Sequence, residues 1–151
     1  MRHVDAGRAR ALFVAAPVAR LATVDAGGRP RLVPVTFATD GDRLYSAVDH
    51  KPKTTTDLAR LRDIEVNPEV TLLADHYDDD WSALWWVRVR GIATIVTERD
   101  VHDRALDLLA DKYPQYAERR PEGPVIVVAL TEWRGWSATA GSAGDGVAPA
   151  D

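Results

Sequence analysis

The sequence predicts a mainly β domain of the α+β type, an antiparallel barrel whose connections carry short helices. Roughly six segments have the length and the β-branched or apolar content of strands, and short turns join most of them. Segments with helical spacing occur only at a few connections. This order favours an antiparallel barrel over a Rossmann fold, in which strands and helices would alternate.

Residue spacing, turn signals and prolines place the individual elements. Pro34 lies inside the second strand and cannot donate to a sheet ladder, so that strand is expected at an edge, at a bulge or splitting from its neighbour. Gly91 interrupts the longest strand and is expected to mark a β-bulge. The expected elements are a helix at 4–16, strands at 18–24, 31–37 and 43–48, a helix at 55–61, strands at 70–74 and 81–96, a helix at 98–113 and a strand at 124–131.

Length and composition indicate one domain at residues 1–137, followed by a flexible tail at 138–151 rich in Ala, Gly, Ser and Pro. The net charge of −4 argues against general affinity for nucleic acid. The absence of cysteine excludes disulfides, thiolate catalysis and cysteine-ligated metals, and fits a reducing compartment. No apolar run has the length of a signal peptide or a membrane span, so a cytoplasmic protein without membrane partners is expected.

A lysine-rich turn precedes the predicted helix that begins near residue 55. Lys51 and Lys53 flank Pro52 and are followed by three threonines at 54–56. A helix N-terminus offers unpaired N–H groups and a partial positive charge, and ammonium and hydroxyl donors beside it suit a phosphate or another anion. The alternative is an ordinary solvated helix start that a threonine caps.

Three of the five tryptophans lie close together, and arginines follow them. Trp81, Trp85 and Trp86 precede Arg88 and Arg90 on the longest predicted strand. One interpretation is packing in the core or in a dimer interface, where Trp and Arg are enriched, and Trp85 fits it best. The other is a flat aromatic wall for a planar ring, with Trp81 the better candidate for ligand contact.

No set of residues forms a convincing acid–base, nucleophilic or metal centre. His76 lies among the acidic residues of 75–80 and could bind a metal, but an acidic surface turn is the commoner arrangement. No catalytic and no metal-ligating residue is therefore predicted. If the protein is an enzyme, a cofactor supplies the chemistry.

Residues 19–37, 44–81 and 85–91 together resemble the flavin- and deazaflavin-dependent split β-barrel proteins related to pyridoxamine 5′-phosphate oxidase. They resemble most closely the actinobacterial branch of F420-dependent oxidoreductases. A K-P-K-T loop, an N-P-x-V strand and a D-D-D-W loop carry the resemblance, with the W-W-V-R-V-R-G strand. The combination is specific, whereas each piece alone is weak.

The resemblance implies a six-stranded split β-barrel that forms a homodimer, with each cofactor ring in a cleft between the subunits. The cofactor phosphate would be held by Lys51, Lys53, Thr54 and Thr56. The ring would be lined by Pro34, Val35, Thr36, Ala47, Val48 and Asp49, and by Trp81 of the partner subunit. Candidates for contact with the anionic tail of coenzyme F420 are Arg20, Arg31 and Arg88.

The implied reaction is hydride transfer between reduced F420 and a small organic acceptor, without a protein nucleophile. Two alternatives remain open: an FMN-binding oxidoreductase of the same family, and a carrier that binds the cofactor without turnover. Vitamin oxidation is disfavoured, because the segment 131–137 is short and leads directly into the predicted tail.

Overall fold

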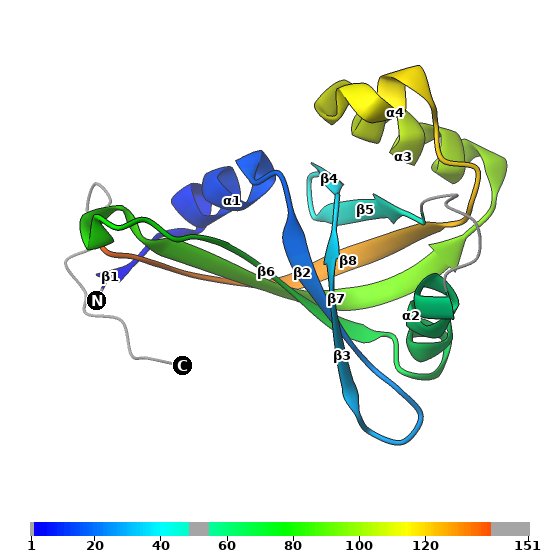
Figure 1. The fold of residues 1–151 in the computed structure, drawn as a ribbon, viewed down its shortest axis with the longest axis horizontal. Helices are drawn as coiled ribbons and strands as arrows, with labels where there is room; N and C mark the ends of the chain where they lie inside the picture. The colour runs from blue at the N-terminus through cyan, green and yellow to red at the C-terminus, as the bar shows by residue number, and fades with distance from the viewer. Residues whose placement is uncertain (1, 49–54, 140–151) are drawn as a thin grey trace.

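One antiparallel sheet dominates the computed structural model, which describes residues 2–48 and 55–139 (Figure 1). The predicted mainly β, α+β class is confirmed. The predicted tail lies outside the described residues from position 140 onward. The elements are β1 (Arg2–His3), α1 (Ala6–Ala15), β2 (Ala19–Val24), β3 (Pro30–Val35), β4 (Ala38–Asp40), β5 (Arg43–Ala47), α2 (Thr55–Val66), β6 (Glu69–His76), the 3-10 turn η1 (Trp81–Ala83), β7 (Trp85–Val96), α3 (Arg99–Lys112), α4 (Pro114–Glu118) and β8 (Val125–Ser137).

The sheet curls into a split barrel because its two edge strands are consecutive in the chain. The strand order is β3-β2-β6-β7-β8-β5-β4, and β1 pairs with β8. Only Thr36 and Phe37 separate β3 from β4, so the two edges must approach each other at this link. No β3–β4 ladder forms within the described residues. The two edges therefore approach each other at the link without forming hydrogen-bonded strand pairs.

The described part of the chain has eight strands, two more than the predicted six. The additional strands are β1 and β4, which contain two and three residues. Strands this short carry no alternating pattern, so sequence periodicity could not reveal them.

Several predicted boundaries change in the structure. The strand expected from residue 81 begins at Trp85, because Asp80 caps η1 by accepting a hydrogen bond from Ser82 N at 3.0 Å. β8 continues to Ser137, well beyond residue 131, because it pairs along the whole of β7. The helix expected at 55–61 extends to Val66.

Two local predictions from single residues are confirmed. Pro34 lies on β3, which is an edge strand. A bulge occurs beside Gly91, where the β7–β8 register shifts between the Arg90–Glu132 and Gly91–Leu130 pairs. The extra residue is Thr131 on β8, so β7 keeps its alternation of buried and exposed positions.

Two apolar clusters hold the fold together. The main cluster lies between α1 and the curled sheet and contains the fully buried Phe13 and Phe37, whose rings pack 4.9 Å apart. The second cluster joins α3 to the sheet through Leu109, Ala105 and Val125. Trp85 packs partly buried against the main cluster, in agreement with its predicted packing role. None of the helices in the described ranges is long and apolar enough to span a membrane.

Candidate functional site

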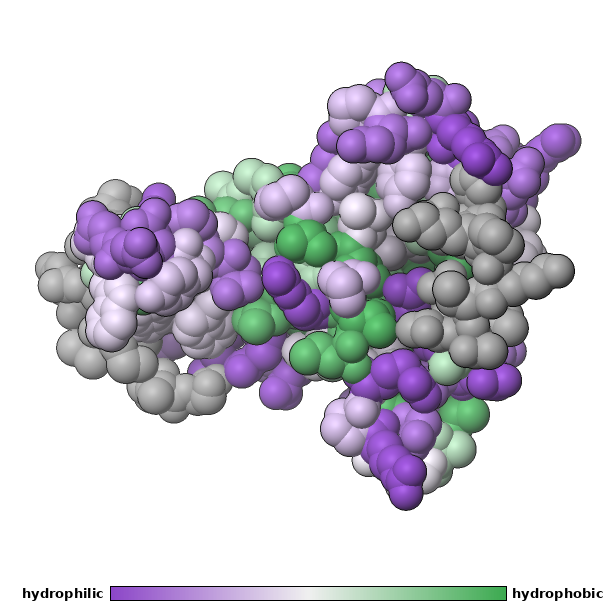
Figure 2. Space-filling view, in the orientation of Figure 1, coloured by the Kyte–Doolittle hydropathy of each residue, from purple (hydrophilic) through white to green (hydrophobic). Residues whose placement is uncertain are grey.

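A cleft of about 580 Å³ lies on the face of β2, β6 and β7 that points away from the main core. On β2, Leu21 and Thr23 face the core, so Arg20 and Ala22 face the cleft. On β6 the same alternation turns Leu73 toward the cleft. Figure 2 shows hydrophobic residues gathered near the middle of the molecule, with mostly hydrophilic residues toward its periphery.

Three tryptophans contribute to the lining of the cleft. Trp85, Trp86 and Trp136 all line it, and Trp86 is the cross-strand partner of Trp136. The His76 ring stacks on Trp85 with ring centroids 6.5 Å apart, and the guanidinium of Arg88 lies 5.6 Å from the Trp86 ring centroid. Two of the three clustered tryptophans, Trp85 and Trp86, thus line the cleft, whereas Trp81, the one preferred for ligand contact, is not among its lining residues. Sequence analysis missed Trp136, because the last strand was expected to end at residue 131.

Of the three arginines considered for an anionic ligand, two line this cleft. Arg20 and Arg88 do so, and Arg20 Nη1 lies 3.8 Å from Asp75 Oδ1 in a half-exposed pair. Such a pair contributes little stability, so Arg20 can turn toward a ligand at small cost. Arg31 is instead engaged with Asp63, at 2.7 Å.

The described residues that were predicted to line the cofactor ring are not themselves among the residues that line this cleft. Pro34 is exposed on the edge of β3, directly opposite Arg20 across the β2–β3 ladder. The side chains of Val35, Ala47 and Val48 are buried, so only the backbone at these positions can face a ligand. The structure does bring the two predicted segments together.

The contact between these segments runs through Thr36. Ser46 Oγ, on β5, donates to Thr36 O at 2.8 Å. The Thr36 hydroxyl itself pairs with the Tyr116 hydroxyl at 2.8 Å. Thr36 is therefore held by side chains from both β5 and α4.

The lysine-rich turn lies outside the described residues: Asp49, Lys51, Lys53 and Thr54 are all in the range 49–54. Thr56 falls in the first turn of α2, and its side chain is not among those described. Val48 N donates to Pro124 O at 3.1 Å at the end of β5, and α2 begins at Thr55.

A buried polar cluster fastens α2 to the sheet. The carboxylate of Asp63, on α2, accepts hydrogen bonds from Arg31 Nε at 2.7 Å and from Thr23 Oγ1 at 2.8 Å. Burial alone would raise the pKa of the Asp63 carboxyl. The hydrogen bonds from Arg31 and Thr23 and the nearby positive charge outweigh burial and lower the pKa below its ordinary value.

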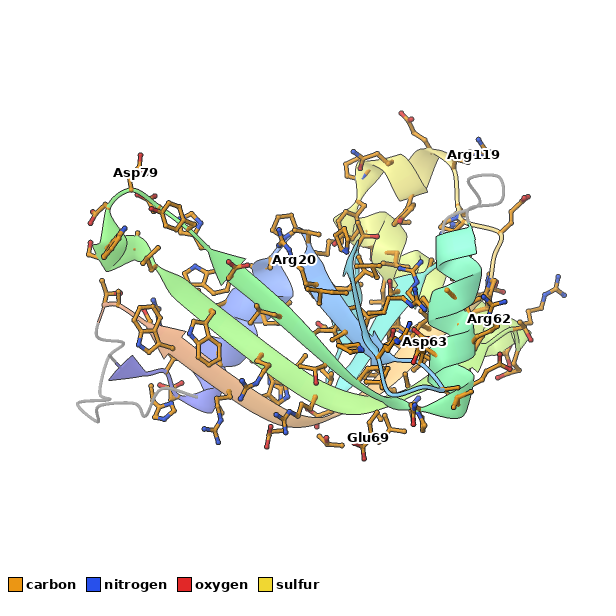
Figure 3. The ribbon with its side chains drawn as sticks, turned by 60° about the horizontal axis from the view of Figure 1, so that its bottom comes forward. Arg20, Arg62, Asp63, Glu69, Asp79 and Arg119 are labelled. Carbon is orange, nitrogen blue, oxygen red and sulfur yellow. The ribbon has the colours of Figure 1, made fainter. Side chains whose placement is uncertain are left out.

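Trp81 lies far from the flanks of the lysine-rich turn. It is 68% exposed on η1, and its Nε1 donates to the Tyr77 hydroxyl at 3.4 Å. Figure 3 shows Asp79, beside η1, at the opposite end of the long strands from Arg62 and Asp63 on α2. One chain therefore does not bring Trp81 to the N-terminus of α2.

The acidic turn at 75–80 serves local structure in the described part of the chain. Asp80 caps η1, and His76 Nε2 lies 3.5 Å from Asp78 Oδ2. Within residues 2–48 and 55–139, no group of three or more His, Asp or Glu side chains is arranged to hold a metal ion.

Comparisons with known proteins agree with this architecture. The pyridoxamine 5′-phosphate oxidase family profile matches residues 6–137. No curated protein matches the chain.

Solved structures with the same fold come from several bacteria. A conserved hypothetical protein from Mycobacterium tuberculosis is 16% identical, with a TM-score of 0.72 over 91% of this chain and 87% of that one. An FAD-binding protein from Mesorhizobium loti is 20% identical, with a TM-score of 0.66 over 89% and 95% of the two chains. The heme storage protein HutZ from Vibrio cholerae is 15% identical, with a TM-score of 0.67 over 87% and 93%. The profile match spans most of the sequence, and the chain belongs to the pyridoxamine 5′-phosphate oxidase family.

Proposed function

We propose that this protein is an F420-dependent oxidoreductase that transfers hydride between the reduced deazaflavin and a small organic acceptor. The observation that carries the proposal is the cleft that combines three indole rings with Arg20 and Arg88, next to the exposed Pro34 on the edge of β3. The flanks of the lysine-rich turn, at Val48 and Thr55, supply the expected position of the phosphate site.

The described side chains fit a planar, anionic cofactor. Indole faces stack on flat ring systems, and arginines pair with carboxylates and phosphates. The bound deazaflavin would supply the hydride chemistry. The residues of the chain would bind the ring, orient it along β3 and exclude water, and none of them has to act as acid, base or nucleophile.

The arginines are the reason to place F420 ahead of FMN. Both cofactors carry a phosphate for Lys51 and Lys53, but only F420 carries a long anionic tail. Arg20 and Arg88 line an open cleft in which such a tail would find positive charge. A flavin remains the second candidate: solved structures of this fold include proteins described as binding FAD, and FMN is the flavin that the sequence resemblance implies.

A carrier that binds the cofactor without turnover is the alternative of a different class. HutZ, described as a heme storage protein, has the same fold. Oxidation of reduced F420 in the presence of enones and quinones would support the enzyme. Tight binding without turnover across that panel would support the carrier.

We infer that a second copy of the chain completes the site. Leu32 is 67% exposed and lines the cleft, as does the more weakly exposed Leu73. An apolar face of this kind needs cover. A two-fold partner would provide it, and would also bring its Trp81 toward the end of the molecule that carries α2.

Light scattering of the wild-type protein is expected to give twice the chain mass at micromolar concentration. Leu32→Glu is expected to shift the protein toward the monomer, because it places a charge in the covered face. Val66→Glu is the control, since Val66 is also exposed at 56% but lies on α2, away from the cleft. A monomeric wild type would contradict the dimer.

Lys53→Ala is expected to weaken binding of F420 and of FMN by roughly tenfold to a hundredfold, the effect of losing one charge-assisted phosphate contact. Quenching of tryptophan fluorescence in titrations with each cofactor measures the affinity. Added salt is expected to weaken wild-type binding more than Lys53→Ala binding.

Arg119→Ala is the matched control, because Arg119 is an exposed cation at the end of α4 (Figure 3). Lys112 is unsuitable for this purpose, since its ammonium lies 3.7 Å from the centre of the Phe37 ring. Equal affinities for Lys53→Ala and Arg119→Ala would place the phosphate elsewhere.

A further inference from the structure

The junction between α3 and α4 packs against the link that joins the two edges of the sheet. Three side chains of this junction, which we call the α3–α4 elbow, make the contact: Lys112, Tyr113 and Tyr116. Their partners are Thr36 and Phe37 of the link, and backbone carbonyls at and just after the C-terminal end of α1.

The Tyr113 hydroxyl bonds to both backbone polar groups of Phe37. It accepts from Phe37 N at 3.1 Å, and it lies 3.1 Å from Phe37 O and 2.9 Å from Pro17 O, two carbonyls that compete for its single proton. Burial raises the pKa of Tyr113, so the hydroxyl stays protonated and able to donate.

Lys112 and Tyr116 fix the link from two more directions. Lys112 Nζ donates to Val14 O at 3.1 Å and lies over the face of the Phe37 ring. The Tyr116 hydroxyl pairs with the Thr36 hydroxyl, and the Tyr113 and Tyr116 rings meet edge to face at 5.7 Å. The elbow thus holds both residues of the link and ties Phe37 to the end of α1.

Side chains replace a sheet ladder at this point. Phe37 lies between the last residue of β3 and the first of β4, where no strand of the described ranges pairs with it. Buried backbone groups need partners, and Tyr113 provides them for Phe37 as Ser46 does for Thr36 O. The position of the link therefore depends on a few hydroxyl groups.

We propose that the α3–α4 elbow is a positioning device for the cofactor-lining strand. By fixing Thr36 and Phe37, it would set the path of the Pro34–Thr36 backbone next to Arg20, which lines the cleft, so that cofactor affinity depends on hydroxyl groups that do not touch the cofactor. The last step rests on the proposed function, whereas the positioning of the link does not.

Tyr113→Phe separates these steps, because it keeps the ring and removes only the hydroxyl. In the protein without cofactor, hydrogen exchange at the Phe37 amide is expected to speed up by about tenfold, since that amide loses its acceptor. Amides of the β2–β6 ladder, such as those of Leu21 and Leu72, are expected to keep their protection. Cofactor affinity is expected to fall roughly threefold to tenfold, the range for one hydrogen bond.

Tyr116→Phe is expected to weaken cofactor binding without exposing the Phe37 amide, because Tyr116 contacts Thr36 instead. Arg119→Ala, at the C-cap of the same short helix, is expected to change neither hydrogen exchange at Phe37 nor cofactor affinity. Unchanged exchange at Phe37 in Tyr113→Phe would overturn the positioning of the link. If the Phe37 amide exchanged faster in Tyr113→Phe while cofactor affinity stayed at the wild-type value, the link between the elbow and the cofactor site would be overturned. A wild type that binds neither F420 nor FMN would refute the proposed function and with it the cofactor role of the elbow. Hydrogen exchange at the Phe37 amide would still test whether the elbow positions the link.

Discussion

Replacing Asp63 by alanine is expected to lower the free energy of unfolding by about 3 kcal/mol, the low end of the range for breaking a buried ion pair. Asp63 is 4% exposed, and its carboxylate accepts hydrogen bonds from both Arg31 Nε and the buried hydroxyl of Thr23. The substitution would leave both donors without that acceptor, and the partial exposure of Arg31 keeps the loss from being larger. Urea denaturation measures the change.

Asp107→Ala is the matched control for this prediction. Asp107 pairs with Arg120 at 2.8 Å, almost the same separation, but both side chains are about half exposed. An exposed pair contributes at most about 1 kcal/mol. Equal losses in Asp63→Ala and Asp107→Ala would show that the buried cluster does not fasten α2.

The pH dependence provides an independent check on Asp63. Its pKa is lower in the folded protein than the ordinary value of 3.8. The contribution to stability is therefore fully present above pH 3.8 and is lost as the pH falls through the folded pKa. Asp63→Asn is expected to lack this part of the acid dependence, because an amide does not titrate in that range.

The same cluster links stability to the proposed site. α2 begins directly after the lysine-rich turn, and Asp63 connects this helix to β2 and β3. Loss of the Asp63 cluster would make the N-terminus of α2 more mobile, and this N-terminus is expected to face the phosphate. Asp63→Ala is thus expected to weaken cofactor binding together with stability, whereas Lys53→Ala affects binding alone.

Local sequence features predicted the fold well where local physics decides the structure. Alternation found the long strands. The missing N–H of Pro34 indicated an edge, a bulge or a split, and β3 is an edge strand. The glycine at 91 indicated the bulge, because a residue without Cβ permits unusually close approach.

Features that depend on distant partners could not be predicted in this way. β8 continues past residue 131 through charged residues and a glycine, because β7 supplies a partner along its whole length. Thr23 and Asp63 look like ordinary polar residues until the fold brings them together across 40 positions. The same holds for Tyr113 and Phe37, which are 76 positions apart.

In the candidate site, too, residues close together in the sequence could be found, whereas residues brought in by strand pairing could not. The cluster of Trp81, Trp85 and Trp86 could be identified from its spacing, but the preferred ligand contact, Trp81, is not on the cleft, whereas Trp85 and Trp86 line it. Trp136 joins them only through strand pairing. The lysine-rich turn, which carries the strongest motif, lies outside the described residues and stays a prediction.

Gly91→Ala is expected to destabilise the fold by about 3 kcal/mol, at the upper end of the usual range for overpacking. A Cβ at this position would lie 2.3 Å from Ala129 O and 2.6 Å from Val128 Cγ1. The first of these atoms belongs to the backbone of β8 and cannot move without disturbing the β7–β8 ladder. Urea denaturation and far-ultraviolet circular dichroism measure the effect.

Gly27→Ala is the control, because the nearest atom to its added Cβ is Asp25 Oδ1 at 3.4 Å, an ordinary van der Waals distance in an exposed turn. Its expected change is within about 0.5 kcal/mol. If Gly91→Ala were as stable as Gly27→Ala, the bulge at Thr131 would have to absorb the extra carbon by shifting β8. Such a shift would displace Trp136 relative to Trp86, so its signature would be altered tryptophan fluorescence at unchanged stability. The expected result is the opposite: a large loss of stability, because the close approach at Gly91 fixes the two strands that build the aromatic wall.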